Sequence, residues 1–364
     1  MYRSSALARV LTVIVAVVLA PVGAGLLAGG GRVWMSSVFQ YARELDLAEL
    51  AGPTALQVLG ILLLVAVVIT GIWSSAGLIA VGVLSLAPIV FAMFPAALIT
   101  SQRAVRLPLE WTDGIIYGVP LVLFPALGTM GVVLALARRR PEPKGAGLGI
   151  VGGILAPVLL AFGAGLLAWG IGTGMLYAYQ RFEMAVQPVA VASVLGGVIL
   201  VVIGIAVTRW SPFALLLPAL ALLVVNALVL LPDVFFPALF QLPREISSTL
   251  PALLLFGTGT AAAFLYLSYT FVLRRVRSRA QQTPAAPVAA SSSGQLPGQH
   301  PIYPPSPAQY FPGTGMGPAA HSPAIPTYPP APGHRSDPFI TPENRRKGPD
   351  HADRALFHAV PPEL

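Results

Sequence analysis

Eight long runs of apolar residues alternate with short polar segments along the chain. They cover residues 9–29, 54–71, 76–99, 115–137, 147–170, 189–208, 212–231 and 251–273. No run has an acidic residue, a basic residue or a histidine in its interior, and a helix needs about 20 apolar residues to cross the hydrocarbon core of a bilayer. The pattern therefore predicts eight transmembrane helices. The first run resembles a secretory signal, but we expect a retained helix because a similar run recurs in mid-chain.

The apolar pattern occurs twice. The hexapeptide Gly-Ala-Gly-Leu-Leu-Ala stands at 23–28 and again at 163–168. Further matches follow in the same order: Val58–Gly60 with Val194–Gly196, Trp73–Ser74 with Trp210–Ser211, and Leu107–Glu110 with Leu242–Glu245. Because some matches lie in polar loops, chance similarity between apolar segments is a poor explanation. We predict an all-α integral membrane protein in which residues 1–140 and 141–279 are two four-helix repeats. An even number of spans in each makes the repeats parallel.

Composition supports a membrane location and basic residues predict an orientation. Hydrophobic residues make up 55% of the chain and charged residues only 10%, against about 25% charged residues in soluble domains. Basic residues prefer the cytoplasmic ends of spans. If the N-terminus is placed in the cytoplasm, the loops and span ends on the cytoplasmic side hold more basic residues than those on the other side. The cytoplasmic side then holds Arg3, Arg9, Arg138–Arg140, Lys144, Arg209, Arg274, Arg275, Arg277 and Arg279. We expect a bacterial plasma-membrane protein with both termini in the cytoplasm.

The net charge of +8 is explained by this cytoplasmic excess, so we expect no nucleic-acid partner. The chain has no cysteine, and its five histidines all lie beyond residue 299. No phosphate-binding or dinucleotide-binding glycine motif is present. We therefore predict no catalytic residues, no cofactor and no metal ion. A transferase acting at the outer face through loop carboxylates stays open as a third alternative.

The loops on the predicted outer side carry charges at matching positions of the two repeats. If the repeats pair about a central axis, these charges form a quasi-symmetric ring. Its candidate members are Arg43, Glu44, Glu110, Arg181, Glu183 and Glu245. The alternative is that each charge makes a local salt bridge that holds a loop against its helices. A stretch within this region, residues 35–50, predicts an amphipathic helix of about four turns.

Residues 280–364 differ in composition from the rest of the chain. They are rich in Pro, Ser, Ala and Gly and bury too little apolar surface to fold, so we predict a disordered cytoplasmic tail. Two similar motifs occur there, Tyr303-Pro304-Pro305 and Tyr328-Pro329-Pro330, and proline-rich strings of this kind dock onto aromatic grooves. Leu356 and Phe357 mark a short apolar motif near the end.

These features predict a non-enzymatic membrane scaffold of the cell envelope or division machinery, with protein partners held by the tail. The alternative is a transporter or channel for an uncharged or lipid-like solute, with a path between the repeats lined by Asn226 or Thr258. Spans without ionisable residues argue against a proton-coupled carrier. The sequence predicts neither the substrate, the identity of the partners nor the oligomeric state.

Overall fold

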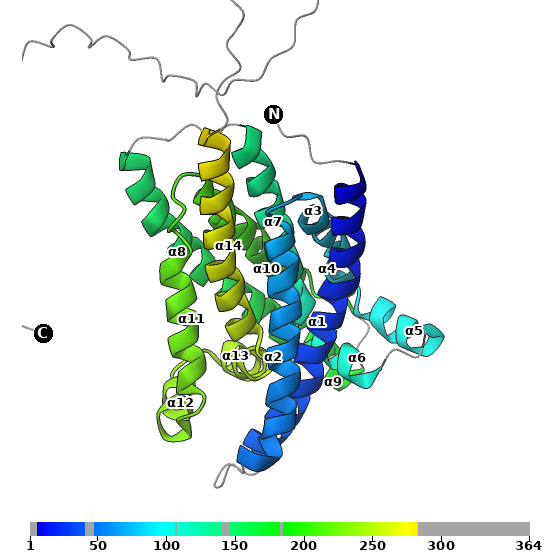
Figure 1. Ribbon diagram of the computed structural model, residues 1–364. Coiled ribbons are helices and arrows are strands. Elements are labelled where there is room, and N and C mark those ends of the chain that lie inside the picture. Colours follow the sequence, from blue (N-terminus) through cyan, green and yellow to red (C-terminus); the bar gives the residue numbers. More distant parts are fainter. Residues whose placement is uncertain (1–5, 41–46, 106–107, 140–145, 183–184, 283–364) are drawn as a thin grey trace, which may run out of the picture. The chain divides into compact units, whose positions relative to one another are not determined.

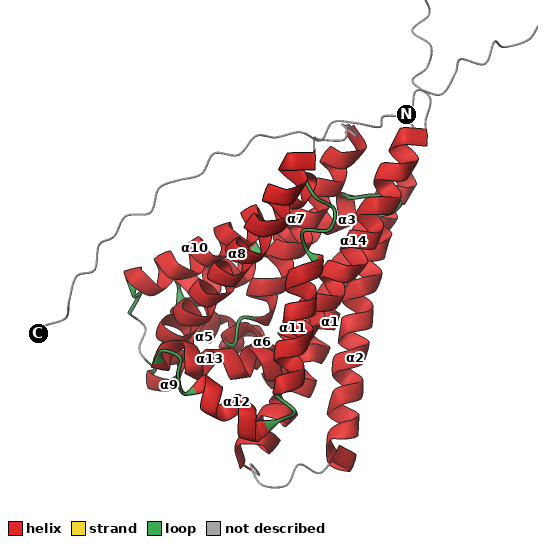
Figure 2. Cartoon of the chain, turned by 90° about the vertical axis from the view of Figure 1, so that its left-hand side faces the viewer, coloured by secondary structure: helices red, strands yellow, loops and turns green. Residues whose placement is uncertain are grey.

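The computed structural model describes residues 6–40, 47–105, 108–139, 146–182 and 185–282, and every regular element in these ranges is a helix (Figures 1 and 2). Six helices are long and apolar enough to cross a membrane. Two further pairs of helices pass the same test together but are bent at a break, which gives up to eight spans. The chain is therefore a helical protein of the multi-pass membrane type, as predicted.

The first half contains three long helices and four short ones. They are α1 (Ala6–Gln40), α2 (Leu47–Thr70), α3 (Ala76–Leu84), α4 (Leu86–Met93), α5 (Pro95–Val105), α6 (Leu109–Ile116) and α7 (Val119–Arg139). The predicted run 76–99 is divided at Ser85 and again at Phe94, the residue before Pro95. A residue before proline is disfavoured in the helical region, which accounts for the second break.

The second half follows a similar order with different breaks. Its elements are α8 (Ala146–Gly170), the π-helix η1 (Ile171–Leu176), α9 (Tyr177–Arg181), α10 (Pro188–Ala206), the 3₁₀-helix η2 (Val207–Arg209), α11 (Leu216–Leu228), α12 (Pro232–Leu239), α13 (Arg244–Leu255) and α14 (Thr258–Gln282). The predicted single span 212–231 is α11, which has 13 residues and is followed by a bend of 112° into α12. At 1.5 Å per residue α11 is about 20 Å long, too short to cross a bilayer alone.

Two pairs of helices cross at glycines. A Cβ built on Gly23 of α1 would lie 3.0 Å from the carbonyl oxygen of Gly60 in α2, and one built on Gly163 of α8 would lie 3.1 Å from that of Gly197 in α10. Helices in membranes associate through small residues because lipid tails provide no hydrophobic drive between them. The two GAGLLA segments thus hold the same kind of helix crossing. The contact partner in the second half is Gly197, one residue after the Gly196 that the sequence match aligns with Gly60.

The interior of the described part is built around α7 and α14. Leu127 and Leu134 of α7 and Tyr269 of α14 are completely or almost completely buried in the main apolar core. In contrast, Ile154 and Phe162 of α8 are 66% and 68% exposed. Large apolar side chains on the outside are expected where lipid replaces water as the solvent. The sequence predicted a separate helix over residues 35–50. In the described part of that stretch this prediction is wrong, because residues up to Gln40 belong to α1 and residues from Leu47 onward belong to α2.

Candidate functional site

The two halves meet at a pair of aromatic rings. Tyr117 follows α6 and Phe256 follows α13, and their ring centroids are 4.9 Å apart with an interplanar angle of 38°. Each ring is followed by a glycine with a positive φ, +78° at Gly118 and +70° at Gly257. A side chain is strained in this conformation, so glycine is the residue that permits a break between two helices here. We call Tyr117, Gly118, Phe256 and Gly257 the central junction.

Each half also contacts the break of the other half. Ile171, the first residue of η1, packs against Gly118. Gly31, in the last part of α1, lies against Phe256, where a Cβ on the glycine would be 2.9 Å from that of the phenylalanine. These contacts fill the space around the two rings from both sides, so the central junction is tightly packed.

A polar side chain of α2 forms a hydrogen bond at the break between α13 and α14. The Gln57 side-chain amide in α2 donates a hydrogen bond of 2.6 Å to the backbone carbonyl of Leu255, the last residue of α13. Carbonyls at the end of a helix lack an intrahelical partner, and an unpaired one is costly away from water. Gln57 therefore stabilises the bend of 63° between α13 and α14.

Asn226, which the sequence offered for a solute path, and the buried Thr129 both bond within their own helices. The Asn226 side-chain amide donates to the carbonyl of Leu222, and the Thr129 hydroxyl donates to that of Pro125, both at 2.8 Å. Thr258 is buried at the start of α14, and its hydroxyl has no partner within the described residues. A side chain that bonds a carbonyl one turn earlier in its own helix is directed along that helix, so these bonds give no sign of a polar route between Asn226 and Thr129.

A charged cluster that the sequence did not indicate lies where α1 meets α6. Arg32 forms an ion pair of 3.3 Å with Asp113, and Glu110 and Trp111 lie on the same short helix. Partial burial raises the pKa of Asp113, while the positive charge of Arg32 opposes this and the charge of Glu110 adds to it. The pair is partly exposed, and such pairs contribute about 0–1 kcal/mol. Its main effect is to hold α6 against α1.

The predicted ring of outer charges is described in part. Glu110 and Glu245 are exposed at the first turns of α6 and α13, and the Arg181 guanidinium lies 5.4 Å from the ring centre of Tyr177. Among the described residues these three side chains form no ion pair with one another. Three members lie outside the described ranges, namely Arg43, Glu44 and Glu183. The ring stays a prediction.

Two arginines at the opposite end of the bundle make equivalent contacts. Arg138, near the end of α7, donates to the carbonyl of Gly71 in the turn between α2 and α3. Arg277, near the end of α14, donates to the carbonyls of Thr208 and Arg209 at 3.2 and 2.9 Å, in the turn after α10. Each arginine thus ties a hairpin turn to the last long helix of its half. We call this end the basic end.

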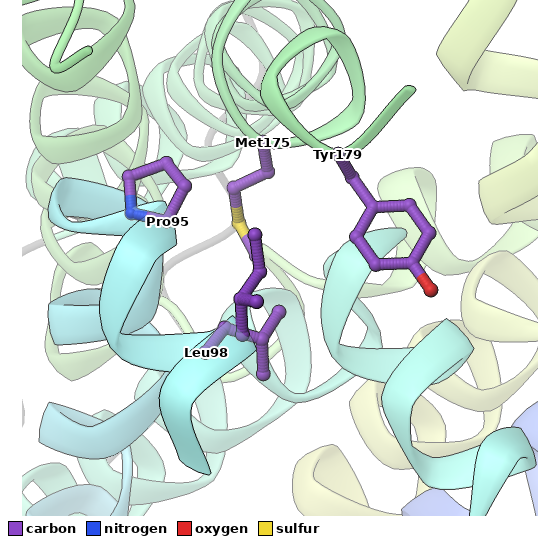
Figure 3. Close-up of a pocket in the computed structure, with 5 residues that line it drawn as sticks. Pro95, Leu98, Met175 and Tyr179 are labelled. Atoms are coloured by element: carbon purple, nitrogen blue, oxygen red, sulfur yellow. The ribbon is translucent and has the colours of Figure 1, made fainter. Parts of the chain in front are cut away.

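A small void lies where α5 meets η1 and α9 (Figure 3). Met175 reaches from η1 toward Leu98 of α5, with Pro95 and Tyr179 on either side. The void has a volume of about 10 Å³, about that of one water-sized sphere. The void is a packing gap and is too small for a substrate.

No group of three or more potential metal ligands occurs in the part of the chain that the structure describes. The tail motifs at Tyr303, Pro304, Pro305, Tyr328, Pro329, Pro330, Leu356 and Phe357 lie outside that part. The fold and the central junction define the class as a helical protein of the multi-pass membrane type. Comparisons with protein families, with curated proteins and with solved structures find no match for the chain.

The central junction and the arginine contacts were missed at the level of sequence, although both leave a signal. An aromatic residue followed by glycine occurs at 117–118 and at 256–257, 139 residues apart, and the arginines at 138 and 277 have the same spacing. Gln57 is a polar side chain inside an otherwise apolar run. A polar residue in such a position usually has a specific partner in the folded protein.

Proposed function

We propose that the chain is a non-enzymatic membrane platform that presents its proline-rich tail to partner proteins in the cytoplasm. The observation that carries the proposal is the packed aromatic contact at the central junction, which joins the two halves through Tyr117 and Phe256. A bundle joined in this way is suited to holding a fixed position in the membrane. The tail supplies the motifs for recognition.

The membrane part is proposed to be two copies of one four-helix unit in parallel orientation, residues 1–140 and 141–279. Reciprocal contacts support this, because α2 packs on α14 while α10 packs on α7. The spacing of equivalent residues supports it as well. Gly23 of α1 and Gly163 of α8 are 140 residues apart, and each approaches a glycine carbonyl of the next long helix. The spacing shifts from 135 at Glu110 and Glu245 to 139 at the glycines of the central junction, because α13 is four residues longer than α6.

The orientation is proposed from charge. Arg138, Arg209 and Arg277 gather at the basic end, and the excess of basic residues favours the cytoplasmic side. Asp113 and Glu110 belong to the other end of the bundle. An even number of spans then leaves the tail in the cytoplasm, where it can meet soluble partners.

A transporter or channel for an uncharged solute is the alternative. It requires a polar route through the bundle, for which Asn226 and Thr258 are the candidates. The hydrogen bond from Asn226 into its own helix and the packed central junction favour the platform instead. An outer-face transferase would need Glu110 or Glu245 beside an arginine, and Glu110 shares its short helix with the Asp113 that already pairs with Arg32.

Removal of the tail tests the platform function. We expect the full chain to co-purify with cytoplasmic partners that are absent from a chain ending at Gln282, which keeps α14 whole. Within the full chain, replacing both Tyr303 and Tyr328 with alanine should remove partners that bind the repeated motif. Replacing Tyr310, which lies outside that motif, is the matched control. Identical partner sets for the full and shortened chains would contradict the proposal.

A further inference from the structure

An apolar groove opens on the side of the bundle where the two halves meet at the basic end. It runs between α3 and α4 on one side, α7 at its floor, and α10 with η2 on the other side, and its volume is about 760 Å³. Ligand sites in proteins typically measure about 300–1,000 Å³. Val132 and Ile203 line the groove and are 47% and 44% exposed, so it is open to the surroundings of the helices.

Two glycines form part of the wall of the groove. Gly82 and Gly128 line it and approach so closely that a Cβ on Gly82 would lie 2.7 Å from the Cα of Gly128. The two hydroxyl groups in its wall are already bonded within their own segments, Ser85 to the carbonyl of Gly82 at 2.6 Å and Thr129 to that of Pro125 at 2.8 Å. The lining therefore offers hydrocarbon contacts and no free polar group along its length.

One end of the groove is different in chemistry. Arg209 and Trp210 line it there, at the basic end of α10. No carboxylate of the described residues forms an ion pair with Arg209. A tryptophan beside an arginine at the end of a span is typical of the membrane–water interface. The groove is thus apolar along its length and has a positive charge without an ion-pair partner at one end.

The length of the groove corresponds to one leaflet of a bilayer. Along α7 its lining extends from Pro125 to Leu136, which at 1.5 Å per residue is about 16 Å. The hydrocarbon core of a bilayer is about 30 Å thick, so one leaflet accounts for about half of that. A lipid with its headgroup at Arg209 would have its acyl chain along the floor formed by Gly128 and Val132.

The matching face of the other half does not have these small residues. With the spacing of 139 residues that relates Arg138 to Arg277, the counterparts of Pro125, Gly128 and Val132 are Phe264, Leu267 and Phe271. Large side chains thus stand where the groove has small ones. The comparison uses the duplication proposed above, whereas the groove itself does not depend on it.

We propose that the groove binds one anionic phospholipid from the leaflet at the basic end, with its phosphate at Arg209 and one acyl chain along α7. Charge complementarity favours an anionic headgroup, and the apolar lining favours an acyl chain. The binding is separate from any partner of the tail, because every residue that lines the groove belongs to the helical bundle.

Thermal unfolding of the purified full chain in a neutral detergent, with added lipid, tests this. We expect phosphatidylglycerol to raise the Tm more than phosphatidylcholine does, and inorganic phosphate alone to have no effect. Arg209→Gln should weaken the apparent affinity for phosphatidylglycerol at least about tenfold, because the phosphate loses a hydrogen bond from a charged donor. Phosphatidylcholine should then stabilise this variant about as well as phosphatidylglycerol.

A variant in which a larger side chain fills the groove provides a second test. Val132→Phe places in the groove the side chain found at residue 271 and should abolish lipid-dependent stabilisation. Val158→Phe is the matched control, because Val158 of α8 is 46% exposed and lies outside the groove. Equal stabilisation of the natural chain by both lipids would overturn the proposal, as would Val132→Phe behaving like its control. A change of oligomeric state in Val132→Phe would instead assign the groove to a second copy of the chain.

Discussion

Replacing Gly118 with valine is expected to lower the free energy of unfolding by about 3–5 kcal/mol. Gly118 has a φ of +78°, a conformation that a β-branched residue adopts only with strain. The added side chain would also meet Ile171, which packs directly on the glycine. Both costs fall at the central junction, where η1 of the second half packs against the break between α6 and α7.

Thermal unfolding of the purified protein measures this effect. A loss of this size corresponds to a decrease in Tm on the order of 10 °C for a chain of this length. Gly149→Val is the control, because a Cβ at Gly149 of α8 has no neighbour within 4 Å. If Gly118→Val and Gly149→Val unfold at the same temperature, the central junction does not hold the two halves together.

Replacing Arg277 with methionine is expected to cost about 2–4 kcal/mol, because it removes two hydrogen bonds made by a charged donor. The carbonyls of Thr208 and Arg209 would lose their partner from α14. Methionine is about as long as the aliphatic stem of arginine, so it keeps the apolar contacts of that stem. The change therefore isolates the hydrogen bonds from the packing.

Arg275 provides the matched control for this variant. It lies two residues before Arg277 on α14 and is exposed. Arg275→Met should change the Tm by less than about 1–2 °C, as is usual for a surface substitution. Equal losses for the two variants would mean that net positive charge at this end, and not the contact with the turn, stabilises the bundle. Arg138→Met should resemble Arg277→Met, since Arg138 binds the turn at Gly71.

The sequence predicts the helices well and the breaks between them poorly. Each of the eight apolar runs contains a helix, because burial in lipid requires long stretches without charge. Apolarity alone does not reveal where such a run bends. The run 251–273 reads as one helix, but Gly257 adopts a positive φ and separates α13 from α14. A glycine inside an apolar run is equally typical of close helix packing, and Gly60 and Gly197 serve that role.

The sequence marks some residues of the central junction, but it does not show which distant residues they contact, at the junction or along the groove. Gln57 and Leu255 are 198 residues apart. The groove takes its lining from segments of both halves and depends on how α7 and α10 face each other. The ion pair between Arg32 and Asp113 was also missed. It joins Arg32 to Asp113 near the ends of their helices. Under the proposed duplication the corresponding residues, Gly172 and Ser248, carry no charge, so the duplication gives no signal for this pair.

The side of the membrane on which each end of the bundle lies tests the platform account most directly. The natural chain has no cysteine, so a single introduced cysteine reports on one position without background. Four positions outside the long helices are suitable: Trp73, Ser211, Glu110 and Glu245. In right-side-out vesicles, a membrane-impermeant maleimide should label the cysteines at 110 and 245 at once, and those at 73 and 211 only after permeabilisation. Labelling of 73 and 211 from opposite sides would contradict the parallel duplication, and labelling of both from outside would place the tail away from the cytoplasm.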